Sequence, residues 1–484
     1  MDFGDIATNL VTIIVLINFI LAGILVFIER KDIGTTWAWL MVIYFIPVLG
    51  FLFYIFFGRR LRRKNFYRMS VEEKEYLQSM VDKQLQRLND EEFSQKPLIT
   101  KYRESIRMNL TSANALMTTN NEIEILNDGK DKFNTLFDDI RNAKEEINIE
   151  YYIIRRDSLG KKLRDELTKK AKDGIKVRVL YDGIGSRKIS SSFYKDLIAN
   201  GGEVGEFFPS IFKLINFRIN NRNHRKLCII DGKIAYIGGF NVGDEYLGLH
   251  KKFGYWRDTH LRIKGDAVQH IQGRFILDWN QATKQQTGNI KKFSFSTETY
   301  KADSIVQIIS GGPSSKTQHL KNMYIKLISS AKKEVWIQTP YFVPDSSFMD
   351  ACKMALLSGV DVRIMIPNKP DHPFVYWATW SYVGELLAYG AKILLYENGF
   401  LHAKTMVVDQ EVATVGTTNI DNRSFELNFE INATVYDEKV ATQLKQMFLE
   451  DSTVCSVLTL ERYQNRSNLI KFKESISRLL SPIL

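Results

Sequence analysis

The sequence predicts an α/β fold of two pseudo-symmetric halves packed together, preceded by an N-terminal two-helix transmembrane hairpin. One observation is a repeated motif: HRKLCIIDGKIAYIGGFN begins at His224, and HAKTMVVDQEVATVGTTN begins at His402. Composition alone gives such a pair odds of roughly half a percent, so the repeat is not accidental. The other observation is two long uncharged stretches before residue 58. The expected units are a hairpin with its basic flank (1–64), a helical juxtamembrane connector (65–120), a first half (121–300) and a second half with the C-terminal tail (301–484).

The hairpin is predicted from Leu10–Ile28 and Trp37–Phe57, which have 19 and 21 residues and no charged side chain. About 20 apolar helical residues are enough to cross the hydrocarbon core of a bilayer. The chain starts with two acidic residues, Asp2 and Asp5, and a second apolar stretch follows the first at once, unlike a cleaved signal peptide. A hairpin buried in a protein core is the alternative.

The basic run GRRLRRKNFYR, which ends at Arg68, predicts the orientation of this hairpin. Positive residues favour the cytoplasmic side, so we expect both termini and the catalytic domains on the cytoplasmic face of the cell membrane. The same run would attract anionic headgroups. A topology signal without any lipid-binding role explains the run equally well.

The connector is predicted to be helical and charged from about Ser70 to Asn120. Ser70 and Glu73 have the spacing of a capping box, in which each side chain binds the other residue's backbone amide. We expect this segment to carry no chemistry of its own.

Each half is predicted to contain a strand–helix–strand unit. AKEEINIEYYIIRRDSLGKKLRDELTKKAKDGIKVRVLYD begins at Ala143, and AKKEVWIQTPYFVPDSSFMDACKMALLSGVDVRIMIPNKPD begins at Ala331. Gly174 and Gly359 precede the second strand in the two copies, where a helix should end. Such units pair their strands in parallel through a right-handed crossover. The copies are offset by 188 residues here and by 178 at the motifs, which indicates an old duplication with unequal loops.

The repeated motif places a histidine beside a lysine in each half. HRKLCIID and HAKTMVVD are rich in β-forming residues, and residues i and i+2 of a strand point to the same face. His224 therefore lies beside Lys226, and His402 lies beside Lys404. One imidazole with one cation is a half-site for a phosphate, and two halves brought together would surround a single anion.

The later positions of the motif have other expected roles. Asp231 and Asp409 complete the candidate catalytic set, but they lie on the opposite pleat near the strand end. We expect these aspartates to hold the turn or the neighbouring strands rather than to touch substrate. Asn241 and Asn419 can donate amide hydrogens and are the candidate phosphate-binding residues.

Two imidazoles that converge on one phosphate suit phosphoryl transfer without a metal. One attacks phosphorus and forms a phosphohistidine, and the other protonates the leaving alkoxide and then deprotonates the incoming nucleophile. The lysines and asparagines would stabilise charge on the phosphoryl oxygens. Each imidazole also needs an acceptor on its other nitrogen. Asp258 and Glu430, at comparable distances downstream of the two histidines, are the candidate orienting residues.

The doubled pattern HxKxxxxD followed by GGxN resembles the phospholipase D superfamily. The segments TWAWLMVIYFIPVLGFLFYIFFGRR and SRLLSPIL are similar to those of the bacterial cardiolipin synthases within it. The resemblance covers nearly the whole chain and implies two phospholipase D-like halves. The second copy departs mildly from the pattern, with Gly416–Thr417 where the first has Gly238–Gly239.

The resemblance implies a definite reaction. One phosphatidylglycerol gives its phosphatidyl group to an enzyme histidine and releases glycerol, and a second phosphatidylglycerol accepts the group to give cardiolipin. His224 is the implied nucleophile and His402 the implied acid and base, although the pseudo-symmetry leaves the reverse assignment open. No cofactor and no metal are implied. Hydrolysis, or transfer to serine or to an ethanolamine lipid, would use the same motif, so the acceptor stays open.

The net charge of +11 suggests an anionic partner, either nucleic acid or an anionic membrane. The two apolar stretches favour a phospholipid substrate and an anionic membrane, with no nucleic acid; a membrane-attached nuclease and a non-enzymatic scaffold are the rivals. The aromatic and basic segment Phe207–Asn223 suits either an interfacial segment or a packed loop, and the tail Asn468–Leu484 is a weaker interfacial candidate. The oligomeric state does not follow from the sequence.

Overall fold

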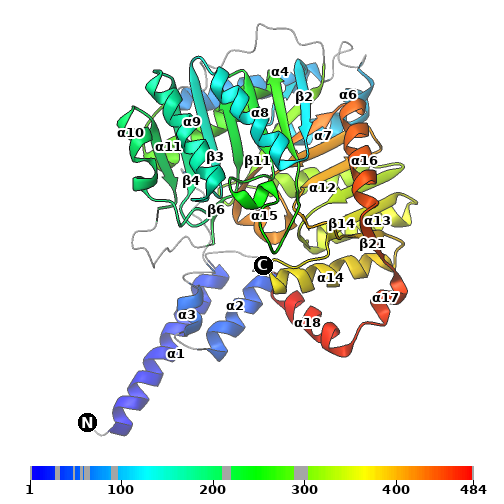
Figure 1. The fold of residues 1–484 in the computed structure, drawn as a ribbon. Coiled ribbons are helices and arrows are strands. Elements are labelled where there is room, and N and C mark those ends of the chain that lie inside the picture. Colours follow the sequence, from blue (N-terminus) through cyan, green and yellow to red (C-terminus); the bar gives the residue numbers. More distant parts are fainter. Residues whose placement is uncertain are drawn as a thin grey trace.

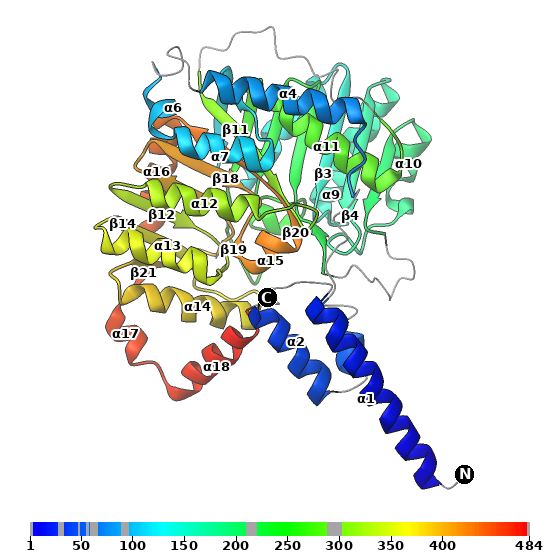
Figure 2. The same cartoon turned by 180° about the vertical axis from the view of Figure 1, so that it is seen from behind.

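The computed structural model of the chain describes residues 3–27, 33–46, 49–54, 58, 66–88, 96–209, 220–287 and 303–481. Two α/β bodies lie side by side, and the N-terminal helices project from one end of the pair (Figure 1). Connector helices cross the opposite end of the molecule, where α4 lies over both bodies (Figure 2). The predicted α/β fold of two halves is therefore present.

The first half is built on a seven-stranded sheet with the order β2-β10-β8-β7-β3-β4-β5. Strands β3 and β4 pair in parallel and are joined by α9, as predicted. Strand β7 begins at Lys226 and lies antiparallel to β3. The strands are β2 (Asn121–Leu126), β3 (Glu146–Tyr151), β4 (Lys176–Asp182), β5 (Glu203–Phe207), β7 (Lys226–Ile230), β8 (Ile234–Gly238) and β10 (His260–Gly265), and the helices are α8 (Gly129–Asn142), α9 (Ser158–Lys172), α10 (Lys195–Ala199) and α11 (Ala267–Thr283).

The second half repeats this plan in a larger sheet with the order β1-β11-β20-β18-β17-β12-β14-β15-β21. Strands β12 and β14 pair in parallel through α13, and β17 lies antiparallel to β12. The strands are β1 (Met117–Thr118), β11 (Ile305–Gly311), β12 (Glu334–Gln338), β14 (Asp361–Pro367), β15 (Lys392–Tyr396), β17 (Thr405–Val408), β18 (Val412–Gly416), β20 (Asn428–Tyr436) and β21 (Cys455–Leu458), and the helices are α12 (His319–Ser330), α13 (Ser346–Leu357), α14 (Pro373–Leu387), α15 (Asn422–Glu426), α16 (Glu438–Ser452), α17 (Leu460–Gln464) and α18 (Asn468–Leu479).

The two crossover helices begin and end with matched residues. Asp157 caps α9 by accepting from the amide of Gly160, and Asp345 caps α13 by accepting from the amide of Phe348, both at 3.1 Å. Gly174 and Gly359 follow the helices with φ of 83° and 85°, a conformation that costs glycine little. The duplication is thus preserved down to the individual helix caps.

The connector belongs structurally to both halves. Ser70 and Glu73 form the predicted capping box at the start of α4 (Val71–Arg87), with bonds of 3.1 and 2.9 Å. After α6 (Pro97–Lys101) and α7 (Arg103–Ala113), strand β1 pairs with β11. The connector therefore adds an edge strand to the second sheet.

The two halves meet in a shared apolar core and in two short strand pairs. Leu227 and Ile237 of the first sheet pack with Val415 and Ile431 of the second, all fully buried. Strand β6 (Arg222–Asn223) pairs in parallel with β20, and β9 (Trp256–Arg257) pairs in parallel with β16 (Phe400–Leu401). Because β6 ends one residue before His224 and β16 ends one residue before His402, each motif starts at the boundary between the halves.

The N-terminal helices are α1 (Phe3–Phe27), α2 (Ile33–Phe45) and α3 (Leu49–Phe53). Asn18 Nδ2 donates to the carbonyl of Ile43 at 3.3 Å and so joins α1 to α2. Within the described ranges, no helix combines the length and the apolar character needed to cross a bilayer. Of the second predicted span the structure describes α2, which ends at Phe45, and α3, which begins at Leu49, while residues 47–48 lie outside the described residues.

Several features expected from the sequence lie partly outside the described residues. They are most of the basic run (59–65), the middle of the aromatic and basic segment (210–219) and the last three residues of the tail (482–484).

Candidate active site

The backbone at each motif histidine is fastened to the opposite half. The amide of His224 donates to the carbonyl of Phe429 at 2.9 Å, and the amide of His402 donates to the carbonyl of Arg257 at 2.7 Å. These bonds extend the short strand pairs described above. The fold therefore fixes both histidines at the boundary between the halves, the seam, and each histidine is hydrogen-bonded to the opposite half.

The carboxylates that contact the two imidazoles are also exchanged between the halves. His224 Nδ1 lies 2.9 and 3.0 Å from the two carboxylate oxygens of Glu430, and His402 Nδ1 lies 2.6 Å from Asp258 Oδ2. Both carboxylates are fully buried. A carboxylate only accepts hydrogen bonds, so each Nδ1 carries the hydrogen and each Nε2 keeps its lone pair. The sequence spacing did not indicate that the pairs would cross.

The motif lysines lie beside their histidines, as the strand alternation predicts. Lys226 Nζ donates to the carbonyl of His224 at 2.6 Å, and Lys404 Nζ donates to the carbonyl of His402. Both ammonium groups are buried, and each has further hydrogens beyond this one bond. The pair of lysines gives the site two cations that an anion can neutralise.

Burial shapes the proton affinities of all four groups. Burial lowers the pKa of His224 and of His402 to about 4, against the opposing pull of Glu430 and Asp258. Burial likewise lowers the pKa of Lys226 to about 7 and of Lys404 to about 8. The positive charge of Lys404 also lowers the pKa of His224, and that of Lys226 lowers the pKa of His402. The four groups therefore act on one another as a single centre.

The motif aspartates lie away from this centre, which corrects their place in the candidate catalytic set. The carboxylate of Asp231 accepts from the amides of residues 144–146 at 2.7–3.0 Å, and that of Asp409 accepts from residues 332–334 at 2.7–3.0 Å. Asp231 meets the start of β3, whereas Lys226 pairs with Tyr151 at its end. The two ends of β3 are about 16 Å apart at 3.3 Å per residue. The aspartates hold the next strand, as the alternation suggested.

The two motif asparagines have different surroundings. Asn241 Oδ1 accepts from the amide of Ile153 at 3.1 Å, and Asn241 Nδ2 donates to the hydroxyl of Tyr246 at 3.1 Å, so this side chain already holds its loop. Asn419 is buried, and within the described part of the chain its Oδ1 has no hydrogen-bond partner. Binding of phosphate by Asn241 and Asn419 therefore stays a prediction, with one amide hydrogen of Asn241 already used.

Several residues close to the histidines were not predicted from the sequence. Thr417 Oγ1 donates to Glu430 Oε2 at 2.5 Å, and it occupies the position where the motif departs from its first copy. Tyr152 lies edge-on to His224 with ring centroids 4.8 Å apart, while Trp256 lies 5.1 Å from His402. The departure at Thr417 was visible in the sequence. The aromatic contacts depend on the seam and had no signal there.

A buried network connects the connector to the residue beside His224. Arg225 Nη1 donates to Asp278 Oδ2 at 2.8 Å and Arg225 Nε donates to the carbonyl of Glu430 at 3.2 Å. Asp278 also accepts from the hydroxyl of Tyr67 at 2.6 Å. Next to Tyr67, the ring of Phe66 stacks on Phe429 at 5.0 Å. Phe66 and Tyr67, which follow the N-terminal helices, therefore bind residues that contact the catalytic centre.

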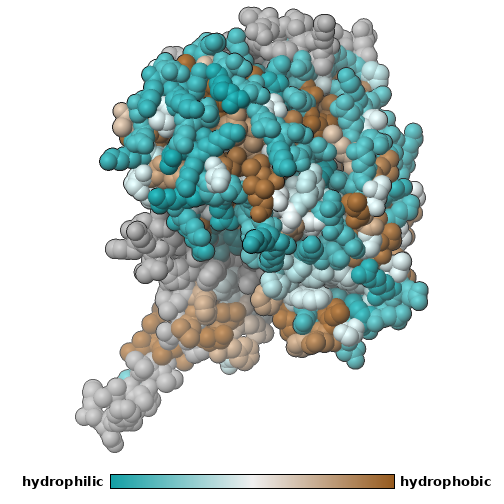
Figure 3. All heavy atoms as spheres, viewed as in Figure 1, coloured by the Kyte–Doolittle hydropathy of each residue, from teal (hydrophilic) through white to brown (hydrophobic). Residues whose placement is uncertain are grey.

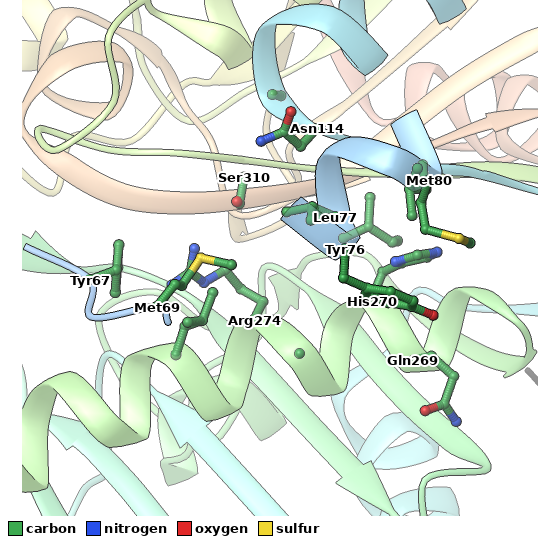
Figure 4. Close-up of a pocket in the computed structure, with 15 residues that line it drawn as sticks. Tyr67, Met69, Tyr76, Leu77, Met80, Asn114, Gln269, His270, Arg274 and Ser310 are labelled. Carbon is green, nitrogen blue, oxygen red and sulfur yellow. The ribbon is translucent and has the colours of Figure 1, made fainter. Parts of the chain in front are cut away.

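A separate cavity of about 250 Å³ lies under the connector (Figure 4). It is lined by Tyr76, Leu77 and Met80 of α4 and by His270 and Arg274 of α11, and none of its lining residues belongs to either motif. The cavity is therefore distinct from the histidine centre. In the part of the chain that the structure describes, no group of three or more histidine, cysteine or acidic side chains is arranged to hold a metal ion.

The chain matches the family model described as "Cardiolipin synthase, PLD-like domain" over residues 136–279 and 324–452. Residues 10–59 match the model described as "Phospholipase_D-nuclease N-terminal". The chain is 51% identical to the major cardiolipin synthase ClsA of Bacillus subtilis, over 99% of this chain and 100% of that protein. It is 50% identical to a cardiolipin synthase of Listeria monocytogenes, over 98% of this chain and 99% of that protein.

Among solved structures, the phosphatidylserine synthase of Haemophilus influenzae covers 79% of this chain and 100% of its own, with a TM-score of 0.61. The sequence identity is 16%, so this likeness concerns the fold. It supports the arrangement of two α/β halves around one seam.

Proposed function

Because the chain belongs to the cardiolipin synthases of the phospholipase D superfamily, we propose that it is a phosphatidyltransferase that converts two phosphatidylglycerol molecules to cardiolipin and glycerol. The observation that carries the proposal is the seam centre, where two histidine–lysine pairs and two exchanged carboxylates surround one site. Full-length similarity to named cardiolipin synthases supports phosphatidylglycerol as donor and acceptor.

The first half-reaction transfers the phosphatidyl group to the enzyme. The lone pair on Nε2 of His224 attacks phosphorus and the P–N bond forms. The bond between phosphorus and the oxygen of the headgroup glycerol breaks. At this stage His402 must carry a proton on Nε2, and the negative charge of the bound phosphate favours that protonated form. The proton passes to the leaving oxygen, so glycerol departs neutral. Glu430 stabilises the charge that develops on His224, because His224 Nδ1 donates to it. Lys226 and Lys404 neutralise the phosphoryl oxygens.

The second half-reaction reverses these roles at His402. Its imidazole, now neutral, takes the proton from the terminal hydroxyl of a second phosphatidylglycerol, whose oxygen attacks phosphorus. The P–N bond breaks and leaves His224 neutral, so both histidines return to their starting state. Asp258 holds the Nδ1 hydrogen of His402 throughout and keeps Nε2 free for the proton.

The assay uses purified full-length protein in liposomes with radiolabelled phosphatidylglycerol and no added metal. We expect cardiolipin and free glycerol in equal amounts, and their loss in His224→Ala and in His402→Ala. His250→Ala is the matched control, because His250 is exposed and lies outside both motifs. Phosphatidic acid as the only lipid product would make the protein a hydrolase. No turnover of phosphatidylglycerol would contradict the proposal outright.

A second arm decides which histidine is the nucleophile. A phosphodiester with a nitrophenol leaving group departs without needing a proton, so loss of the general acid should not prevent the first step. His402→Ala should therefore release one equivalent of nitrophenol and retain the phosphoryl group on His224. A burst from His224→Ala and none from His402→Ala would reverse the assignment.

We also propose that α1–α3 form the membrane anchor, with both termini and the catalytic halves on the cytoplasmic face. The apolar stretches, the basic run that follows them and the match of residues 10–59 to an N-terminal family model support this placement. The lock formed by Phe66 and Tyr67 would then hold the catalytic halves close to the bilayer. Resistance of the protein to alkaline extraction from membranes, lost on removal of residues 1–58, tests the anchor.

A further inference from the structure

Helix α18 (Asn468–Leu479) presents four large apolar side chains to solvent, whereas its buried residues are the polar Glu474 and Ser477. Leu469, Phe472, Ile476 and Leu479 are 62%, 63%, 39% and 76% exposed. At 100° per residue these four lie within one arc of the helix. An ordinary surface helix of a soluble protein has the opposite arrangement, with its apolar stripe facing the core.

Ion pairs hold the helix in this orientation. Glu474 is 2% exposed and accepts from Arg466 Nε at 2.8 and 2.9 Å. Arg478 donates to Glu385 of α14 at 2.6 Å and lies over the ring of Tyr382 at 4.5 Å. Rotation of α18 to bury its apolar arc would break the contacts of Arg478 with α14 and expose Glu474. The outward arc is therefore a fixed feature of the fold.

The position of α18 indicates what covers this arc. Helices α17 and α18 lie at the same end of the molecule as α1–α3 (Figure 1). The space-filling view shows hydrophobic surface over α18 and over the hairpin at this end, while the other end is mainly hydrophilic (Figure 3). Lys471 and Lys473 are exposed on the same helix and can contact anionic headgroups.

We propose that α18 is a second membrane contact, which lies in the interface of an anionic bilayer with Leu469, Phe472, Ile476 and Leu479 among the acyl chains. The side-chain pattern is that of an interfacial helix, apolar on one face and basic beside it. The hairpin fixes one point of the body, and α18 fixes a second. Two points prevent the catalytic halves from tilting about the anchor.

The test measures depth directly and does not depend on turnover. Full-length protein with His224→Ala, which stops lipid conversion, and Cys455→Ser, which removes the partly exposed cysteine, is placed in phosphatidylglycerol–phosphatidylethanolamine liposomes. An environment-sensitive dye is attached at Phe472→Cys or at Leu479→Cys. We expect blue-shifted emission, quenched by lipids with a nitroxide near the headgroup, and weaker quenching in phosphatidylcholine liposomes.

Two reference positions make the result decisive. Leu357→Cys on α13 is the matched control, because Leu357 is 74% exposed and lies on a different helix. Phe19→Cys reports on the hairpin, whose insertion is the premise of this inference. Emission at Phe472→Cys like that at Leu357→Cys, with Phe19→Cys quenched, would overturn the α18 contact and leave the anchor intact. Loss of quenching at Phe19→Cys would refute the anchor itself.

Other occupants of the arc give distinct outcomes. A blue shift at Phe472→Cys that rises with protein density and is insensitive to nitroxide lipids would show a second copy of the chain there and would contradict the proposal. As an independent check, Phe472→Ser with Leu479→Ser should weaken turnover of vesicle phosphatidylglycerol but preserve turnover of a monomeric short-chain analogue. Leu357→Ser should change neither.

Discussion

At the scale of single residues, the two crossed pairs are similar but not equivalent. A Cβ atom at Gly239 would lie 1.9 Å from Asp258 Oδ1. The short side chain of Asp258 can therefore contact His402 only because residue 239 has no side chain. The matching position, Thr417, instead donates its hydroxyl to Glu430, whose longer side chain passes beside it. The change from glycine to threonine thus follows the change from aspartate to glutamate.

This complementarity predicts different effects of the same substitution. Gly239→Ala should displace Asp258 from His402 and lower kcat severely. Thr417→Ala removes one hydrogen-bond donor from Glu430, which costs about 1–3 kcal/mol of hydrogen-bond energy, so it should lower kcat less. Thr417→Ser should restore kcat because it restores the hydroxyl. Steady-state kinetics on liposomes measures both, with little change expected in KM. Full activity in Gly239→Ala would show that Asp258 does not need this approach.

The sequence predicted the chemistry of these residues better than their contacts. Duplication alone identified His224, Lys226, His402 and Lys404, because unrelated positions do not repeat at fixed spacing. It also drew attention to Asp258 and Glu430, but not to the exchange between halves. That exchange arises where β6 and β16 cross the seam, and no local pattern encodes the pairing of such short strands.

At the scale of elements, the turn after each motif strand has the same left-handed form. Asp231 and Gly232 have φ of 53° and 62°, and Asp409 and Gln410 have φ of 52° and 59°. Glycine adopts this region freely, whereas a residue with a Cβ pays about 1–2 kcal/mol. Asp–Gly is a favoured residue pair for a tight turn between strands, whereas Asp–Gln is not. The strand register forces Gln410 into the same conformation.

We therefore expect Gln410→Gly to raise the free energy of unfolding by about 1 kcal/mol, since it removes a strained side chain at no cost in contacts. Gly232→Gln is the matched reverse change and should lower it by a similar amount. Thermal unfolding in detergent measures both, with activity retained because the turn is far from the histidines. A lower melting temperature in Gln410→Gly would show that the glutamine is not strained.

The predictable elements are those whose signals are local. The crossover units β3–α9–β4 and β12–α13–β14 were expected from a strand pattern, a helix and a closing glycine, and both are present. The second apolar stretch was expected as one helix; the structure describes it as α2 and α3, with residues 47–48 between them outside the described residues.

At the scale of the whole molecule, the catalytic centre is buried at the junction of two sheets that share one core. Burial lowers the pKa of His224 and of His402 to about 4, so both imidazoles stay neutral in the folded chain until the pH falls to about that value. In the unfolded chain the same side chains take up protons near pH 6.5. Between these values the unfolded state binds more protons, so the free energy of unfolding falls as the pH falls from 6.5 toward 4.

Replacing both histidines should flatten this dependence. Asparagine keeps a donor toward each carboxylate but does not titrate, so His224→Asn with His402→Asn should lose the histidine contribution, about 1.4 kcal/mol for each unit of pKa difference. Melting temperatures of the two proteins from pH 7 to pH 4 provide the comparison, since the remaining titrating groups are common to both. Parallel curves would indicate that the histidines are not held neutral by the fold.

The exchange of carboxylates also indicates how the duplicated chain could have evolved and why its two halves depend on each other. His224 depends on a residue 206 positions away, and His402 on one 144 positions away. Two identical single-motif chains related by a two-fold axis would make the same exchange, so a homodimer is a natural ancestor. Once fused, the copies were free to diverge into an Asp–Gly and a Glu–Thr version. They were not free to separate, because neither half contains the carboxylate that contacts its own histidine.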